Sequence, residues 1–300
     1  MASDVRISVI INERSGAGHA DIGERVQKLF AAAGTAVRLE RVRDGGDIAA
    51  RARQAADRSD VLVAAGGDGT VGTVAGAAIV TGLPLGVLPL GTFNHFAKDL
   101  RLPLDLGAAV GVVVAGHVQS VDAGDVNGRI FVNNSSIGFY PRMLWERGAA
   151  RHSGRGKWSA SALALLRVTH TYRTHVARLL IDGRERVART PFVFIGNNRY
   201  EVEGFELGGR ASLREGLLSL YVAPDCGRFE TLALPLRAVL NRLTTDPRFE
   251  AFSAAEVSIG LSSAQTMVAL DGEVALMRAP LHFRSRPGAL RVLLPPAMGT

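Results

Sequence analysis

The alternation of short apolar runs with longer helical segments constrains the fold of the first 120 residues more than any other feature. Four runs are apolar and short enough to be buried strands, and the segments between them have helical spacing or are apolar throughout. Successive parallel strands need such crossover helices, so the pattern predicts a doubly wound α/β domain with a parallel sheet. The predicted strands are 5–12, 35–42, 60–67 and 84–91, and the predicted helices are 19–34, 46–59 and 71–82.

The pattern changes near residue 122. Asn127-Gly128 and Asp182-Gly183 are dipeptides that favour tight hairpin turns, and each lies between strand-like runs. Further strand-like runs follow towards the C-terminal end, interrupted by helical spacing at Lys157–Tyr172 and Arg228–Leu243. This arrangement predicts a second, mainly antiparallel β domain, whose last strand can return to the first domain. The predicted domains are 1–124 and 125–300.

Composition and charge narrow the classes of partner. The chain is 47% hydrophobic, which is enough for a proper core, and its single cysteine, Cys226, excludes an internal disulfide and suits a reducing compartment. The N-terminal segment lacks the pattern of a signal peptide, so we expect a cytoplasmic protein. Tyr140 to Tyr200 holds 12 basic and 3 acidic residues. This excess indicates an anionic partner, which the charge alone leaves open as a nucleic acid, a membrane surface or a phosphorylated small molecule.

The segment 64–74 contains a literal G-x-G-x-x-G at Gly67, Gly69 and Gly72, directly after a predicted strand. Dinucleotide-binding loops also have an acidic residue about 20 positions further on. Here the first carboxylate after Asp68 is Asp99, so the dinucleotide interpretation is not favoured. An aspartate among phosphate-binding amides suits a bound Mg²⁺ or a proton acceptor. The alternative is an Asp-Gly turn whose residues serve only its backbone dihedral angles.

Two more Gly-rich turns are expected at the carboxyl edge of the sheet, where such folds bind ligands. Gly91, Thr92 and Asn94 lead into a helix and can offer donors to phosphate or ribose, or they are ordinary helix caps. Ser15 and Gly16 follow the first strand and form either a ligand loop or a plain connector.

Asp271 and Glu273 flank a glycine within an apolar strand pair. The spacing fits either a pair of catalytic carboxylates or a hairpin turn with polar tips. The sequence contains no P-loop motif, no Cys/His set with zinc spacing and no G-x-S-x-G elbow.

Four motifs together resemble the diacylglycerol kinase catalytic family, which includes bacterial lipid kinases and sphingosine kinases and shares a superfamily with NAD kinases. In order they are "GGDGT", "GTFNHFA", "NNSSIGF" and "DGE", at 66–70, 91–97, 133–139 and 271–273.

This resemblance implies a two-domain kinase with a phosphofructokinase-like α/β domain, a C-terminal β-sandwich, and ATP bound in the cleft between them. It implies Glu273 as the proton acceptor, with Asp68 and Asp271 as further catalytic residues and Mg²⁺ at Asp68. The nucleotide-binding residues that it implies are Asn12, Ser15, Gly16, Gly66, Gly67, Asp68, Gly69, Thr70, Val71, Gly72, Gly91, Thr92 and Asn94.

The resemblance also implies the substrate and the place of action. The substrate would be a lipid hydroxyl such as that of diacylglycerol, in phospholipid biosynthesis, and the basic C-terminal domain would contact an anionic membrane peripherally. We expect no nucleic acid partner, and an exposed edge strand would permit a homodimer. Two alternatives keep the fold: a soluble NAD kinase, and a nucleotide- or lipid-binding protein without turnover.

Two departures from the family pattern are visible. Glu13 replaces the usual proline after the first strand. Glutamate stiffens the loop less than proline does, and it adds a negative charge. Glu215 stands where bacterial members have an aspartate that binds a second, structural Mg²⁺. The implied ligands of that metal are Ser212, Glu215 and Leu217, and Arg214 could replace the ion by its charge.

Overall fold

The computed structural model describes residues 5–13, 21–43, 48–152, 174–200, 209–210, 212–225 and 250–296. The chain divides into two compact units, and each is described by itself. The first, the α/β unit, comprises 1–123, 129–132 and 286–300. The second, the β unit, comprises 124–128 and 133–285.

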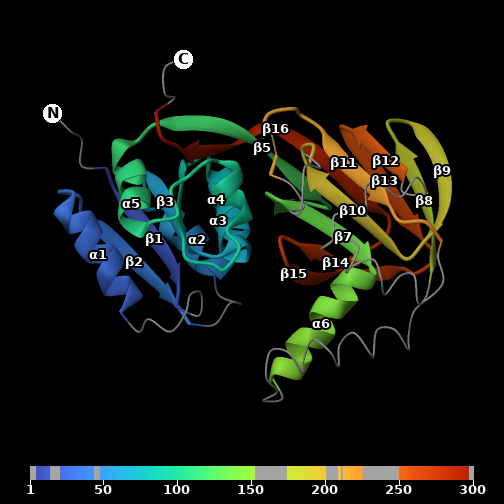
Figure 1. Cartoon of the computed structure of the whole chain (residues 1–300), viewed down its shortest axis with the longest axis horizontal. Helices are drawn as coiled ribbons and strands as arrows, with labels where there is room; N and C mark the ends of the chain where they lie inside the picture. Colours follow the sequence, from blue (N-terminus) through green and yellow to red (C-terminus); the bar gives the residue numbers. More distant parts are fainter. Residues whose placement is uncertain are drawn as a thin grey trace. The chain divides into compact units, whose positions relative to one another are not determined.

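A parallel sheet forms the centre of the α/β unit, with its strands in the order β2-β1-β3-β4. Figure 1 labels β1, β2 and β3 of this sheet. The end of β16 extends the sheet, because Val292 pairs in parallel with Leu85 of β4. β5 pairs with both β16 and β6. The bounds are β1 Ile7–Asn12, β2 Val37–Val42, β3 Val61–Gly66, β4 Leu85–Pro89, β5 Val118–Val126, β6 Arg129–Phe131 and β16 Leu281–Leu293.

Helices cover both faces of this sheet. α1 (Ile22–Ala32) and α5 (Leu106–Ala115) bury Val26, Phe30 and Val110 against the side chains of β1 and β3 that point to one face. α2 (Ile48–Ala56) and α3 (Asp68–Thr81) pack together and contact β3. The predicted doubly wound α/β fold is therefore confirmed.

Two helices of the structure were not predicted from the sequence. α5 reads "LGAAVGVVVA", which is apolar on all sides, so it carries no amphipathic period; Asp105 caps it by accepting the Ala108 N–H at 2.9 Å. α6 (Phe139–His152) begins directly after β7. The predicted helices at 157–172 and 228–243 lie outside the described residues, as does Cys226.

The β unit holds two antiparallel sheets, with strand orders β12-β11-β10-β7-β14-β15 and β16-β13-β8-β9. Buried residues of both sheets, such as Val193 and Leu179, form the interior. This agrees with the predicted β-sandwich. The bounds are β7 Asn134–Gly138, β8 His175–Ile181, β9 Arg184–Thr190, β10 Phe192–Asn197, β11 Leu218–Val222, β12 Glu250–Ala254, β13 Glu256–Leu261, β14 Gln265–Leu270 and β15 Glu273–Arg278.

Hairpin turns with two residues at positive φ connect several of these strands. Asn127-Gly128 joins β5 to β6, with φ of 49° and 82°, and Asp182-Gly183 joins β8 to β9, with φ of 43° and 82°. Asparagine, aspartate and glycine tolerate this left-handed region best, so both predicted turns are confirmed. In the described part of the chain, no helix is long and apolar enough to cross a membrane.

Candidate active site

The "GGDGT" segment forms the turn between β3 and α3. Gly67 caps α3, and Asp68 is the first residue of the helix, so Asp68 and Gly69 lie in the first helical turn. None of Gly66, Gly67, Gly69 and Gly72 has a positive φ. The alternative of an Asp-Gly turn with left-handed dihedral angles is therefore wrong. At Gly66 and Gly67 the absence of a side chain instead allows neighbouring atoms to approach the backbone closely.

Gly66 and Thr70 show that close approach. A Cβ on Gly66 would lie 2.5 Å from Thr70 Oγ1. The buried Thr70 hydroxyl accepts a hydrogen bond from Asn12 Nδ2 at 3.2 Å. Asn12 ends β1, so this bond ties the end of one strand to the helix that follows another.

The "GTFNHFA" loop meets "GGDGT" through glycine backbones. A Cβ on Gly91 would lie 2.5 Å from the Cα of Gly67, so only glycine fits there without a shift of the backbone. Leu90 N–H also donates to Gly66 O at 3.0 Å. Two Gly-rich turns that were predicted separately thus form one surface at the carboxyl edge of the sheet.

Asn94 has an unexpected role. It precedes α4 (His95–Asp99) in a left-handed conformation with φ of 51°, and its side chain makes no cap bond to that helix. Instead its amide accepts from Gly91 N–H and donates to Gly91 O, both at 2.9 Å. The interpretation of Asn94 as an ordinary helix cap is wrong, since its side chain closes the Gly91 turn. Thr92 is exposed in the same turn.

Asp68 joins the two loops a second time. Its Oδ1 accepts a hydrogen bond from Phe96 N–H at 3.1 Å, across 28 residues of sequence. The carboxylate thus caps the short α4 while lying in the first turn of α3, where the helix dipole favours a negative charge.

The sequence suggested that Glu13 adds a negative charge beside these loops. In the structure this charge is balanced by two arginines. The Glu13 carboxylate contacts Arg41 at 3.4 Å and Arg43 at 3.1 Å, at the end of β2. The departure from the family pattern is therefore accompanied by two cations, one in β2 and one directly after it.

These residues fit a nucleotide phosphate group in their chemistry. The N-terminus of the 14-residue helix α3 offers backbone N–H groups, and the absence of side chains at Gly67 and Gly91 lets the second Gly-rich turn lie directly against that end. Among the described residues, no three Asp, Glu, His or Cys side chains cluster as a metal site. Asp68 alone still suits Mg²⁺, because this ion is commonly held by one or two carboxylates together with substrate phosphates and water.

"DGE" forms the hairpin turn between β14 and β15. Asp271 and Gly272 have φ of 47° and 88°, and Leu270 pairs with Glu273. Asp271 Oδ1 accepts hydrogen bonds from Asn133 N–H at 2.8 Å and Asn134 N–H at 3.1 Å. Glu273 is exposed as the first residue of β15. The two carboxylates therefore differ, since Asp271 holds the backbone before β7 and Glu273 faces solvent.

A buried arginine that sequence analysis missed completes this region. Arg210 is 5% exposed and donates to Asn133 Oδ1 at 2.9 Å and to Asn197 O at 3.0 Å. Tyr200 donates to Asn133 O at 3.0 Å, and its ring lies 5.6 Å from the Arg210 guanidinium carbon. The motif "NNSSIGF" contains Asn133 and was the only sequence signal for this cluster. Arg210 lies 77 residues from Asn133, so no local pattern connects the two residues.

The implied ligands of the second metal all have protein partners. Ser212 Oγ accepts from Arg214 N–H at 3.1 Å, and Leu217 O accepts from Asn198 N–H at 2.9 Å. Glu215 Oε2 lies 3.7 Å from Arg199 Nε, a cation that sequence analysis did not name. This second metal site stays a prediction.

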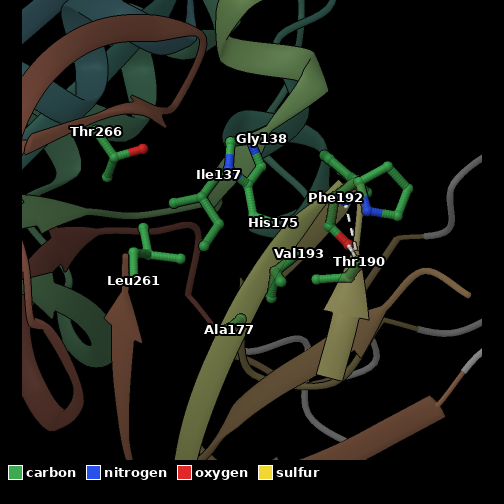
Figure 2. Close-up of a pocket in the computed structure, with 10 residues that line it drawn as sticks. Ile137, Gly138, His175, Ala177, Thr190, Phe192, Val193, Leu261 and Thr266 are labelled. Carbon is green, nitrogen blue, oxygen red and sulfur yellow. Dashed lines mark hydrogen bonds between the residues drawn. The ribbon is translucent and has the colours of Figure 1, made fainter. Parts of the chain in front are cut away.

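A small apolar pocket opens between the two sheets of the β unit (Figure 2). It is lined by both sheets, for example by Ile137, Ala177 and Leu261, and the Thr190 hydroxyl at its rim donates to Phe192 O at 2.8 Å. Its volume of about 10 Å³ holds roughly one water molecule, so it does not accommodate an acyl chain as it stands.

The structure thus brings together Asn12, Thr70 and the two Gly-rich turns in the α/β unit, and it places Asp271 and Glu273 on one hairpin of the β unit. The roles of these residues stay predictions. Ser15 and Gly16 lie outside the described residues.

Comparison with known proteins extends these findings over most of the chain. Residues 6–126 match the family model of the diacylglycerol kinase catalytic domain, and residues 147–294 match that of the YegS C-terminal NAD kinase beta sandwich-like domain. The structure described as a diacylglycerol kinase from Bacillus anthracis str. Sterne has a TM-score of 0.70 at 19% identity, and covers 98% of both chains.

Similar proteins carry names that agree with these two family models. The chain is 40% identical to the diacylglycerol kinase of Staphylococcus saprophyticus over a segment that covers 37% of each protein. In three of the relatives, the match covers between 37% and 59% of the relative's length. The chain is 30% identical to the "probable lipid kinase YegS-like" of Cronobacter sakazakii over 90% of both chains. The chain therefore belongs to the diacylglycerol kinase family of lipid kinases.

Proposed function

We propose that this chain transfers the γ-phosphoryl group of ATP to the hydroxyl of a diacylglycerol-like lipid at an anionic membrane surface. The observation that carries the proposal is the backbone contact of Gly67 with Gly91, which joins two Gly-rich turns at the N-terminus of α3. Phosphoryl transfer depends chiefly on positioning and on neutralising charge, and this end of α3 offers aligned N–H donors for both.

Asp68 would hold the metal ion that accompanies the nucleotide. Mg²⁺, when bound, neutralises phosphate charge, and Asp68 is the carboxylate beside the proposed phosphate site. The hydrogen bond from Phe96 N–H to Asp68 Oδ1 fixes this carboxylate relative to the second loop, so its position depends on both turns.

Glu273 would accept the proton of the lipid hydroxyl. Glu273 is exposed at the start of β15, directly after the two-residue turn, where a substrate can reach it. Asp271 Oδ1 accepts two backbone N–H groups that hold this turn. We therefore assign Asp271 to positioning of the turn, and Glu273 to general base catalysis.

The lipid acceptor is proposed from the family and from the names of its members, and the basic excess of the chain supports contact with an anionic membrane. Action in the cytoplasm and assembly as a homodimer are further parts of this proposal.

The test is transfer of labelled phosphate from ATP with Mg²⁺ to a panel of diacylglycerol, phosphatidylglycerol, sphingosine and NAD. We expect label in one of the lipids and a loss of about 100-fold or more in kcat for Glu273→Gln, which keeps the size of the side chain and removes the base. Glu256→Gln, at an exposed strand residue of the same unit, is the matched control and should keep the wild-type rate.

Two outcomes would overturn the proposal. Label in NAD alone would make this chain a soluble small-molecule kinase. ATP binding without transfer to any acceptor would make it a nucleotide-binding protein without turnover. Wild-type rates in Glu273→Gln would remove Glu273 from the chemistry.

A further inference from the structure

The outer face of the β8–β9 hairpin carries three exposed aliphatic side chains. Val176 and Leu180 of β8 are 45% and 46% exposed, and Val187 of β9 is 58% exposed. Val187 pairs with Arg178, which lies between Val176 and Leu180 on the same face of β8. Diagonal neighbours in such a pair are about 7–8 Å apart, so the three aliphatic residues surround Arg178. These four residues are called the hairpin patch.

The core of the sandwich does not account for these aliphatic residues. Ala177 and Leu179, which alternate with them on β8, are the residues that the interior buries. The solvent face of an antiparallel sheet is ordinarily polar. On the next strand, β13, Arg178 pairs with Gly260, which has no side chain to cover the patch. β9 is the edge of its sheet, beside β8, so no further strand covers the patch from that side among the described residues (Figure 1).

Arg178 gives the centre of the patch a positive charge. The hairpin, 175–190, holds four arginines and two acidic residues. Arg189 and Glu185 share the face of the patch with Arg178, and Glu185 lies opposite Leu180. Arg184 and Arg186 lie on the other face of the hairpin. Arg189 pairs with Asp225 at 3.4 Å, and Arg186 pairs with Glu250. Arg178, at the centre of the patch, is exposed, and among the described residues it has no ion-pair partner. The patch therefore combines exposed aliphatic surface with a cation that is available for an external anion.

We propose that the hairpin patch docks on the surface of an anionic lipid membrane. Aliphatic side chains on a folded surface gain free energy when they enter the boundary between headgroups and acyl chains, and a neighbouring arginine binds lipid phosphates. The proposal rests on the proposed function in one respect, because a lipid kinase must reach a substrate that lies in a bilayer. It assigns the membrane contact to one face of one hairpin.

Co-sedimentation with vesicles tests this directly, without any catalytic step. We expect the wild type to bind phosphatidylcholine vesicles that contain about one third phosphatidylglycerol, and to bind pure phosphatidylcholine more weakly. The double variant Leu180→Glu/Val187→Glu should bind the mixed vesicles at least about tenfold more weakly. Arg178→Gln should weaken binding about fivefold on the mixed vesicles, and have little effect on pure phosphatidylcholine.

Matched controls come from exposed residues of the α/β unit. Val80→Glu/Leu104→Glu removes two exposed aliphatic side chains and adds the same charge as the double variant. Arg38→Gln removes one exposed strand arginine, as Arg178→Gln does. Both controls should bind vesicles like the wild type, and thermal unfolding of every variant checks that it folds.

An activity measurement separates this proposal from the proposed function. A short-chain diacylglycerol dissolved as a monomer should be phosphorylated equally well by the wild type and the double variant, whereas diacylglycerol in mixed vesicles should be phosphorylated poorly by the variant. If the wild type phosphorylates neither, the proposed function fails, and the vesicle-binding result still decides the role of the patch.

Three results would overturn the docking proposal. One is wild-type binding to mixed vesicles by the double variant. Another is no vesicle binding by the wild type. The third is a dimer, measured by light scattering, that the double variant dissociates while its vesicle binding is unchanged, which would assign the patch to a second copy of the chain.

Discussion

Asp68 combines a structural and a chemical role in one side chain. Its Oδ1 accepts the Phe96 N–H at the start of α4, and the same carboxylate lies at the N-terminus of α3, where phosphates are proposed to bind. A substitution that removes the whole side chain would mix the two roles. The amide oxygen of asparagine can still accept the Phe96 bond, so this variant isolates the charge.

For Asp68→Asn, we expect a fall of about 100-fold or more in phosphoryl transfer with little change in Tm, because the metal ligand loses its charge while the hydrogen bond remains. Asp68→Ala should lose activity to the same extent and should also lower the free energy of unfolding by about 1–2 kcal/mol, as for a lost helix cap. Steady-state rates and thermal melts measure both. Equal activity of Asp68→Asn and the wild type would remove the carboxylate from the chemistry.

Asp60 has the clearest perturbed pKa in the described chain. The Arg6 side-chain hydrogen bond, at 2.8 Å, together with the bond from Arg6 N–H, holds the pKa of Asp60 at about 2. A lowered folded-state pKa favours the folded state above the unfolded-state pKa near 3.8, and this contribution is lost as the pH falls from there towards 2. Both groups are exposed, so the effect on stability is small.

In Arg6→Gln, the pKa of Asp60 should rise towards 3.8 without reaching it, because the backbone hydrogen bond from residue 6 remains. Titration of the carboxyl carbon by NMR between about pH 2 and 5 measures the change. Arg38→Gln, on the neighbouring strand, should leave the titration of Asp60 unchanged. An unshifted pKa in Arg6→Gln would show that the backbone bond alone is responsible.

At the scale of elements, the turn end of the β14–β15 hairpin is attached to β7 and to the residue that precedes it. Asp271 Oδ1 accepts two N–H groups from the residues that enter β7, and Asp271 N–H donates to Asn134 O at 2.9 Å. Val268 to Leu270 also pair with β7. The turn that presents Glu273 is therefore fixed by the neighbouring strand as well as by its own dihedral angles.

Asp271→Ala should lower the free energy of unfolding by about 1–3 kcal/mol, because two N–H groups lose their acceptor and alanine is strained at φ of 47°. Asp271→Asn should be milder, since asparagine tolerates this φ and keeps an oxygen acceptor. If Asp271 positions Glu273, the alanine variant should lower kcat with its pH profile unchanged in shape. A shifted pH profile in Asp271→Asn would instead make Asp271 part of the proton transfer.

At the scale of the whole molecule, the described carboxylates indicate how the protein depends on metal. They form no cluster of three that could hold an ion, and Glu215 faces Arg199. A Mg²⁺ ion held with high affinity by the described carboxylates would then need the phosphates of a nucleotide to complete its ligands.

Mg²⁺ alone should therefore leave Tm unchanged, whereas Mg²⁺ with a non-hydrolysable ATP analogue should raise it. A ligand present at 100 times its Kd adds about 2.7 kcal/mol to the stability of the folded state, which a thermal shift measurement resolves easily. A rise in Tm with Mg²⁺ alone that disappears in Glu215→Gln would establish the second metal site that the family resemblance implies.

The sequence by itself determined the class of fold and the position of the motifs. Alternating apolar runs and helical periods identified the four parallel strands, and Asn-Gly and Asp-Gly identified the hairpin turns, because these signals depend on residues close together in the chain. They did not identify α5, which is apolar on every side, or the first turn of α3, whose glycines resemble a loop.

Only the tertiary structure decided which residues meet. Gly67 contacts Gly91, Asn12 bonds to Thr70 across 58 residues, and Arg210 reaches Asn133 across 77. It also showed that Asn94 holds its own turn and that Val176, Leu180 and Val187 share an outer face. Such contacts depend on strand order and register, which bring distant segments together through the packing of the whole sheet, and no local pattern of residues encodes them.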